Sequence, residues 1–135
     1  MARKNNPKYH NKKVEYDGIL FDSIKEKDRY IVLKQAEQAG LITELTLQPR
    51  WELLPAKKEQ YIEHKKTKDV VKERTILQPI RYTADFSYVK DGTFVVEDVK
   101  GSPYTLSRDV PLRLKMMRYF YNIDVRLVYK ASEDI

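Results

Sequence analysis

The stretch VVEDVKG, residues 95–101, places charged side chains inside a segment that otherwise has the composition of a buried β-strand. Val95, Val96 and Val99 favour a strand. Burying a charged side chain is costly unless an opposite charge, hydrogen bonds or an ion compensate it. Any fold of this chain must therefore provide partners for the charged side chains of this strand.

The segment before this strand fixes how the strand pairs. Asp91-Gly92 is a strong turn signal, and it predicts an antiparallel hairpin between residues 78–89 and the VVEDVKG strand. A two-residue turn sets Asp85 directly opposite Asp98, with Cβ atoms about 4.5–5.5 Å apart. A four-residue loop gives the same pairing, whereas a three-residue loop shifts it by one residue. The favoured register therefore brings two carboxylates face to face.

Facing carboxylates destabilise a sheet unless something neutralises them. A divalent cation does so, because hard cations bind carboxylate oxygens; a shared proton is the alternative. Side chains alternate along a strand, so Asp98 and Lys100 share one face and Glu97 points to the other. The pattern predicts a metal site on the hairpin rim with Lys100 beside it. The competing interpretation is a simple pair of Asp98 and Lys100 on a solvated face.

The rest of the sequence predicts a single domain of α/β or α+β class. A hairpin is expected at residues 14–21, and residues 57–74 form a charged insertion that is an exposed loop, a loose helix or a long hairpin. This insertion is either merely solvated or in contact with DNA. The remaining elements are helices at 23–40 and 109–121 and strands at 45–55, 78–89, 93–101 and 123–129. Their order is α-β-β-β-α-β, a mixed sheet flanked by helices and preceded by the N-terminal hairpin.

Composition narrows the chemistry. The 135 residues include no cysteine and two histidines, which argues against disulfides, zinc–thiolate sites and a histidine-based triad. No stretch has the length of a membrane span, and the first residues lack the apolar core of a secretory signal, so we expect a cytoplasmic protein without a membrane partner. The net charge of +6 favours an acidic partner, of which nucleic acid is the commonest.

Glu26 near the start of the first helix, Asp85, and the run Asp98-Val99-Lys100 resemble the PD-(D/E)xK nuclease motif. The order of the expected elements is similar to the core of that superfamily. The segments NKKVEYDGILFDSIKEKDRY, LQPRWEL, YTADF and VVEDVKG are similar to a family of small phage and prophage proteins of unassigned function. Holliday-junction resolvases carry similar motifs.

Three details of the motif leave alternatives. Ala84 stands where the motif has its proline. Glu97 adjoins Asp98, and strand alternation favours Asp98 as the ligand. Glu26 also completes an S-x-x-E capping box with Ser23, so it is a helix cap, a functional carboxylate, or both.

The resemblance implies a restriction-endonuclease-like core and a Mg²⁺- or Mn²⁺-dependent endodeoxyribonuclease. It implies that Asp85, Asp98 and the Val99 carbonyl bind the metal, that Glu26 holds a second metal or a water, and that Lys100 stabilises developing charge or helps deprotonate the water. Branched DNA such as a Holliday junction is the implied substrate, in phage recombination or replication. A homodimer in the cytoplasm of a bacterial host is expected by analogy. The alternative is a non-catalytic DNA-binding protein with the same fold.

Basic and polar residues outside the motif are the expected DNA contacts, with ordinary surface polarity as the alternative for each. A flexible basic arm is expected at residues 1–13, ahead of the nuclease-like domain at 14–135. The expected contacts are Arg3, Lys4, Lys8, Lys12 and Lys13 in the arm and Gln48, Thr105, Arg108 and Lys115 in the domain.

Overall fold

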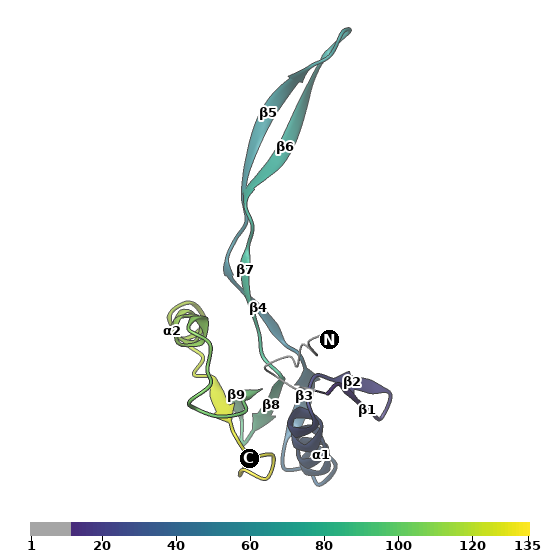
Figure 1. Ribbon diagram of the computed structural model, residues 1–135, viewed down its shortest axis with the longest axis vertical. Coiled ribbons are helices and arrows are strands. Elements are labelled where there is room, and N and C mark those ends of the chain that lie inside the picture. The colour runs from purple at the N-terminus through teal and green to yellow at the C-terminus, as the bar shows by residue number, and fades with distance from the viewer. Residues whose placement is uncertain (1–11) are drawn as a thin grey trace, which may run out of the picture.

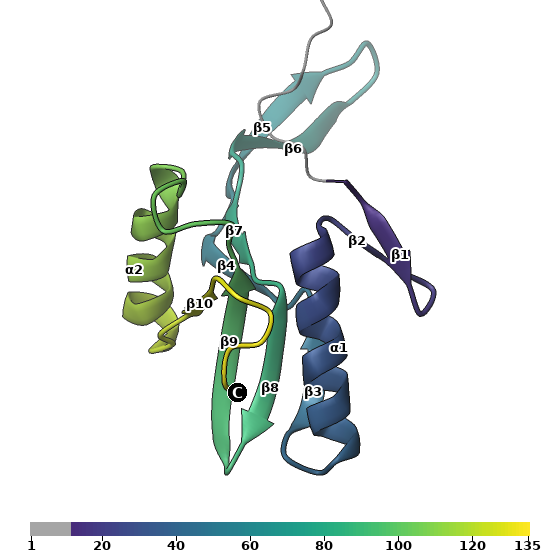
Figure 2. The same cartoon turned by 60° about the horizontal axis from the view of Figure 1, so that its bottom comes forward.

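The computed structural model describes residues 12–135 and has a four-stranded mixed sheet at its centre, in the order β10-β9-β8-β3. β9 and β10 are parallel, whereas β8 is antiparallel to both of its neighbours. Helices α1 and α2 lie on opposite sides of this sheet (Figure 2). In chain order these elements are α1 (Ile24–Gln38), β3 (Thr43–Leu47), β8 (Phe86–Lys90), β9 (Thr93–Val99), α2 (Asp109–Tyr121) and β10 (Arg126–Val128).

This order confirms the mixed α and β class and the expected α-β-β-β-α-β succession in the central sheet. The N-terminal hairpin is also confirmed, with β1 (Val14–Tyr16) paired to β2 (Ile19–Phe21). No helix among residues 12–135 combines the length and the apolar character that crossing a membrane requires.

Helix α1 begins and ends where its sequence predicts. The Ser23 hydroxyl accepts a hydrogen bond of 3.1 Å from the Glu26 N–H, which satisfies one of the free donors of the first turn. At the other end Gly40 has φ +78°, and its N–H donates to the Glu37 carbonyl while the Leu41 N–H donates to the Ala36 carbonyl. These two bonds are the pair that defines a Schellman C-terminus.

The β8–β9 hairpin has the predicted register. Asp91 and Gly92 have φ values of 50° and 75°, the left-handed conformation that a two-residue type I′ turn requires. The pairs run from Lys90 opposite Thr93 to Phe86 opposite Glu97. Asp85, the next residue, also donates its N–H to the Glu97 carbonyl, over 3.2 Å, so the regular pairing ends at Phe86, but the Asp85 carboxylate still lies next to that of Asp98.

The strands expected at 45–55 and 78–89 are each broken in two, so the prediction of two unbroken strands was wrong. The breaks occur at Gln48-Pro49 and at Ala84-Asp85, where Gln48 has φ +50° and Pro49 lacks an N–H to donate. The Gln48 N–H still donates to the Asp85 carbonyl, and the Ala84 N–H donates to the Pro49 carbonyl. The two chains therefore bend together while they stay paired.

Beyond this bend the same two chains continue as a ribbon that projects from the body (Figure 1). Its first part pairs β4 (Arg50–Leu54) with β7 (Ile80–Thr83), and its outer part pairs β5 (Lys57–His64) with β6 (Asp69–Leu77). Of the three alternatives for residues 57–74, the long hairpin is confirmed. The last strand covers only Arg126–Val128 of the expected residues 123–129.

The two faces of the central sheet bury separate apolar clusters. On the α1 face Tyr30 and Leu33 pack with Phe86 and Tyr88. On the α2 face Met117 packs with Val96, Tyr82 and Ala84.

An ion pair lies within the α1 face. Arg29 donates from Nε to Glu97 Oε1 and from Nη2 to Glu97 Oε2, each over 2.7 Å, and both side chains are fully buried. The Tyr88 hydroxyl also donates to Glu97, and Arg126 lies 3.5 Å from it. Arg29 Nη1 additionally donates to the carbonyls of Ala131 and Glu133, so the same guanidinium holds the segment after β10.

The pair yields a stability prediction. Glu97→Gln keeps the shape of the side chain but leaves the Arg29 charge buried without a counter-charge, so we expect a loss of about 3–5 kcal/mol of unfolding free energy. Urea denaturation measures this loss. The control Glu59→Gln breaks an exposed ion pair with Arg74 and should have a much smaller effect. Equal effects of the two substitutions would show that the buried pair contributes nothing special to stability.

Candidate active site

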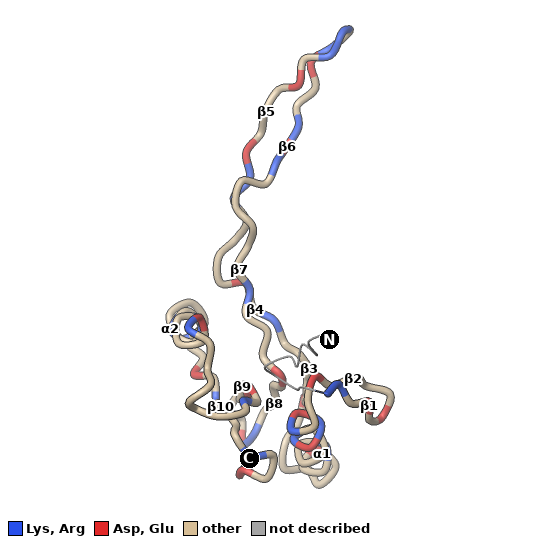
Figure 3. The backbone as a smooth tube through the Cα atoms, viewed as in Figure 1, with Lys and Arg blue, Asp and Glu red and all other residues tan. Residues whose placement is uncertain are grey.

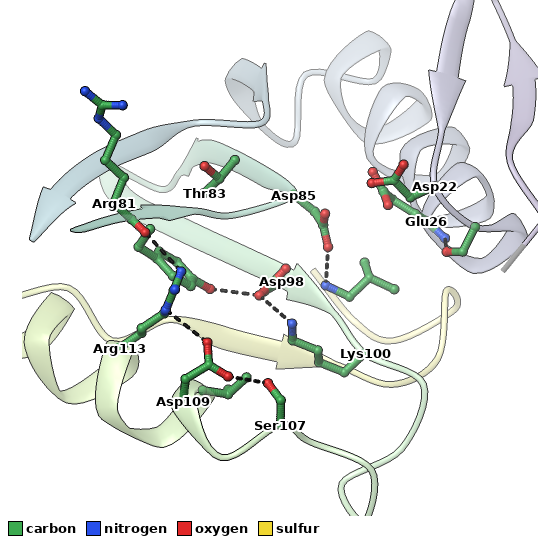
Figure 4. A pocket seen from close by; sticks show the side chains of 14 residues that line it. Asp22, Glu26, Arg81, Thr83, Asp85, Asp98, Lys100, Ser107, Asp109 and Arg113 are labelled. Atoms are coloured by element: carbon green, nitrogen blue, oxygen red, sulfur yellow. Dashed lines mark hydrogen bonds and ion pairs between the residues drawn. The ribbon is translucent and has the colours of Figure 1, made fainter. Parts of the chain in front are cut away.

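One pocket collects the predicted catalytic residues. It lies where the end of β9, the start of α1 and the start of α2 meet, and its volume is about 430 Å³. Figure 4 shows the acidic side chains converging on it from different elements. The predicted residues that line this pocket are Glu26, Asp85, Asp98, Val99 and Lys100.

Asp85 and Asp98 are each anchored through one carboxylate oxygen. Asp85 Oδ2 accepts a hydrogen bond of 2.7 Å from the Val99 N–H. Asp98 Oδ2 accepts one of 2.9 Å from the Tyr82 hydroxyl and lies 3.1 Å from the Lys100 ammonium group. Neither Oδ1 atom accepts a hydrogen bond from an N–H group or a hydroxyl group within residues 12–135.

The closeness of the Asp85 and Asp98 carboxylates affects the protonation of the pair. Burial, with the neighbouring Asp98 carboxylate and the charge of Glu26, raises the pKa of Asp85 to about 9. Without a cation the Asp85–Asp98 pair therefore holds a proton at neutral pH. A divalent cation between the two carboxylates would displace that proton, so the alternatives of shared proton and shared cation would be two states of one site.

Glu26 approaches the pocket from helix α1. Burial, followed by the negative charges of Asp22 and Asp98, raises the pKa of Glu26 to about 7. The capping box is only half formed in the described residues, because Ser23 caps the Glu26 N–H but no hydrogen bond joins the Glu26 carboxylate to the Ser23 N–H. The carboxylate lies beside Asp22 instead (Figure 4).

The set of ligands is sparse. Among residues 12–135, no three Asp, Glu or His side chains converge closely enough to form a metal-binding group. The facing carboxylates of Asp85 and Asp98 are the pair that is brought together, and Glu26 lines the pocket outside that pair. Val99 donates its N–H toward Asp85, and since the N–H and C=O of a strand residue point to the same side, its carbonyl belongs to the same donor set. Mg²⁺ keeps several waters and needs few protein ligands, so this donor set fits it.

The expected DNA contacts are distributed unevenly. Gln48 lies next to the site, because its N–H donates to the Asp85 carbonyl and it lines with Glu26 a second cavity of about 140 Å³. Thr105, Arg108 and Lys115 are exposed and do not line the main pocket. Of the contacts expected in the basic arm, Lys12 and Lys13 are exposed ahead of β1. The others, Arg3, Lys4 and Lys8, lie outside the described residues.

Several pocket residues were not predicted as site residues. Arg113 lies 3.1 Å from Asp109 through Nε and donates from Nη1 to the Arg81 carbonyl. The i, i+4 spacing of Asp109 and Arg113 on a helix was a signal for their pairing. Tyr82 lies in the strand expected at 78–89, and no local sequence pattern indicates that its hydroxyl reaches Asp98. The pocket residues that were not predicted include Asp22, Arg81, Tyr82, Thr83, Ser107, Asp109, Val110 and Arg113.

Residues 6–133 match the family described as Protein of unknown function (DUF1064). The chain belongs to this family. The match spans every pocket residue of this DUF1064 protein as well as the projecting ribbon. Neither the search of curated proteins nor that of solved structures gives a match.

The raised pKa values of Asp85 and Glu26 predict how stability depends on pH. Both groups release their protons at lower pH in the unfolded chain, from ordinary values of 3.8 and 4.5, than in the folded protein. The stability they provide is therefore complete below pH 4 and is lost as the pH rises toward 9. In EDTA we expect the unfolding free energy to fall by at least about 1 kcal/mol from this source between pH 5 and 8.

The substitution Asp85→Asn should flatten this decline, raise stability at pH 8 in EDTA, and remove stabilisation by Mg²⁺ or Mn²⁺. Glu52→Gln, at an exposed position on β4, is the control and should keep the wild-type pH curve. Denaturant titrations at several pH values measure both variants. A less stable Asp85→Asn protein at pH 8 would show that the carboxylate is needed mainly as the acceptor for the Val99 N–H.

Proposed function

We propose that this protein is a metal-dependent endodeoxyribonuclease with a restriction-endonuclease-like core. The observation that carries the proposal is the pair of facing carboxylates, Asp85 and Asp98, with Lys100 bound to one of them and Glu26 lining the same pocket. These are the residues through which the sequence resembles the PD-(D/E)xK motif. The order of elements around the central sheet gives further support.

The pocket contains the groups that phosphodiester hydrolysis requires. Asp85, Asp98 and the Val99 carbonyl would bind Mg²⁺ or Mn²⁺ through oxygen. When bound, the ion would acidify an attacking water and neutralise charge on the phosphate.

Two side chains, Lys100 and Glu26, would carry out the remaining parts of the reaction. Lys100 is partly exposed and carries an ammonium group at the carboxylate pair, so it can stabilise the negative charge that develops on the phosphate oxygens. Glu26 has a pKa of about 7, which suits a carboxylate that orients a water molecule and accepts its proton near neutral pH.

DNA is the proposed substrate because the chain has a net charge of +6 and because Arg81 and Arg113 border the acidic centre. Branched DNA is the leading form, by resemblance to Holliday-junction resolvases. A homodimer would make paired cuts across a junction. The proposed setting is the cytoplasm of a bacterial host, in phage recombination or replication.

The decisive experiment is cleavage of supercoiled plasmid and of a synthetic four-way junction in Mg²⁺, Mn²⁺ or EDTA. We expect cleavage with either metal and none in EDTA. Asp98→Asn should abolish cleavage and leave DNA binding intact, and Lys100→Met should lower kcat by about 10²–10³-fold. Lys130→Met, at an exposed residue outside the pocket, is the control. Tight DNA binding with no cleavage in any metal would establish the alternative, a DNA-binding protein that has the fold without the reaction.

Glu26→Gln separates a catalytic carboxylate from a helix cap. The cap uses the backbone N–H of Glu26, so the substitution preserves it and should leave Tm nearly unchanged. Loss of the charge should lower kcat by about 10²-fold or more and remove the rise of kcat with pH near 7. Wild-type kcat and an unchanged pH profile would leave Glu26 without a part in the reaction.

A further inference from the structure

The outer ribbon, β5 with β6, has no structural role in the body of the protein. Its two strands pair with each other along their whole length, and neither apolar cluster includes any of its residues. Most of its side chains are exposed. Figure 1 shows that it extends away from the sheet and both helices.

The charges of the ribbon are arranged unequally along it. In the two strands, four Lys or Arg residues accompany four Asp or Glu residues. Lys58 lies 3.4 Å from Glu73, and ion pairs also join Lys72 to Glu63 and Arg74 to Glu59. These pairs link opposite strands, so they both neutralise the stem and hold the strands together.

The turn at the end of the ribbon carries the whole excess of positive charge. Its sequence is KKTK, residues 65–68, with three lysines and no acid. Within residues 12–135, none of Lys65, Lys66 and Lys68 forms an ion pair. Figure 3 shows Lys and Arg residues at the far end of the ribbon, the outermost part of the described chain in that view.

From these observations we infer that the β5–β6 ribbon is an arm whose lysine tip binds the phosphate backbone of duplex DNA beyond the cleavage site. The inference rests on the proposed function, because it takes DNA as the ligand of the pocket. A cluster of lysines without acidic partners attracts phosphates and displaces their counterions. A two-stranded ribbon also has the width that the major groove admits. The neutral stem lets the ribbon lie near DNA without repulsion while its tip makes the contact.

The length of the arm sets where that contact falls. Asp85 and Lys68 are joined by a nearly extended chain, and a strand rises about 3.3 Å per residue, so the tip is at most roughly 55 Å from the pocket. This distance corresponds to about 16 base pairs of B-DNA. Because the ribbon is extended (Figure 1), a 10-base-pair duplex centred on the pocket, which covers only about 17 Å on each side, should not reach the tip.

The test compares two variants that remove the same charge from the same ribbon. Lys65→Gln/Lys66→Gln changes the unpaired tip, and Lys58→Gln/Lys72→Gln changes lysines that already have acidic partners. Binding of the full chain to a 40-base-pair duplex is measured in EDTA at several salt concentrations. The tip variant should reduce the slope of log K against log salt by about 1.8 and weaken binding at least about tenfold at 0.1 M salt. The stem variant should keep the wild-type slope, and on a 10-base-pair duplex the tip variant should bind like wild type.

Three results would overturn the inference. Equal slopes for the tip and stem variants would mean that the ribbon contributes only net charge. An equal loss on the short duplex would place the lysines near the pocket instead of beyond it. Loss of a dimer in the tip variant, with an unchanged slope, would make the ribbon a contact between two copies, for which the exposed Ile62 and Val71 side chains would be the surface.

The assay is independent of the nuclease proposal, since EDTA binding requires no cleavage. An active enzyme whose tip variant keeps the wild-type slope would refute the arm alone. An inactive protein with the expected tip effect would refute the nuclease alone.

Discussion

The buried pair of Arg29 and Glu97 sets the position of everything around it. Arg29 belongs to helix α1 and Glu97 to the central strand β9, so the bidentate contact fixes the helix at one height along the strand. Glu26 lies one turn before Arg29, and Asp98 is the next residue after Glu97. Holding one pair in register therefore brings the other pair into the same pocket. A buried ion pair gives little net stability compared with apolar packing, but it strongly favours one arrangement.

The neighbours Glu97 and Asp98 show how one strand can carry both a structural and a chemical carboxylate. Glu97 points toward α1, where Arg29 and Tyr88 satisfy both of its oxygens. Asp98 points to the other face. There Tyr82 and Lys100 contact one of its carboxylate oxygens, and the Asp85 carboxylate lies next to it. The first arrangement satisfies its charge with Arg29, whereas in the second two carboxylates share one cationic partner, Lys100, and the pKa of Asp85 is raised by burial and by its neighbours. An incomplete site of this kind destabilises the fold locally and can attract a cation.

Short-range signals in the sequence were enough to predict the part of the candidate site that lies in one hairpin. The Asp91-Gly92 turn and the strict alternation of strand side chains fix the register up to Phe86 opposite Glu97, and the next residues along, Asp85 and Asp98, bring their carboxylates together. Long-range contacts carried no such signal. Arg29 lies 68 residues from Glu97 in the sequence, and no local pattern pairs them. The hydroxyl of Tyr82 reaches Asp98 across the break at Ala84-Asp85, and alternation along an unbroken strand does not predict this contact. The apolar residues of the ribbon stem show little regular periodicity, so the sequence pattern alone leaves its strands ambiguous, whereas ion pairs across the hairpin join them.

The bend at the base of the ribbon has a mechanical consequence. The chain that returns from the lysine tip runs through β6 and β7 directly into Asp85, whereas Asp98 belongs to β9, which is held by Arg29 on one side and by β10 on the other. The Gln48 N–H joins the opposite chain of the ribbon to the Asp85 carbonyl at the same point. The base of the ribbon is thus connected directly to one of the two facing carboxylates. Hydrogen bonds from the Asp85 N–H to the Glu97 carbonyl and from the Val99 N–H to Asp85 Oδ2 tie this carboxylate to β9, so they would resist any strain that the ribbon transmits to the spacing of Asp85 and Asp98.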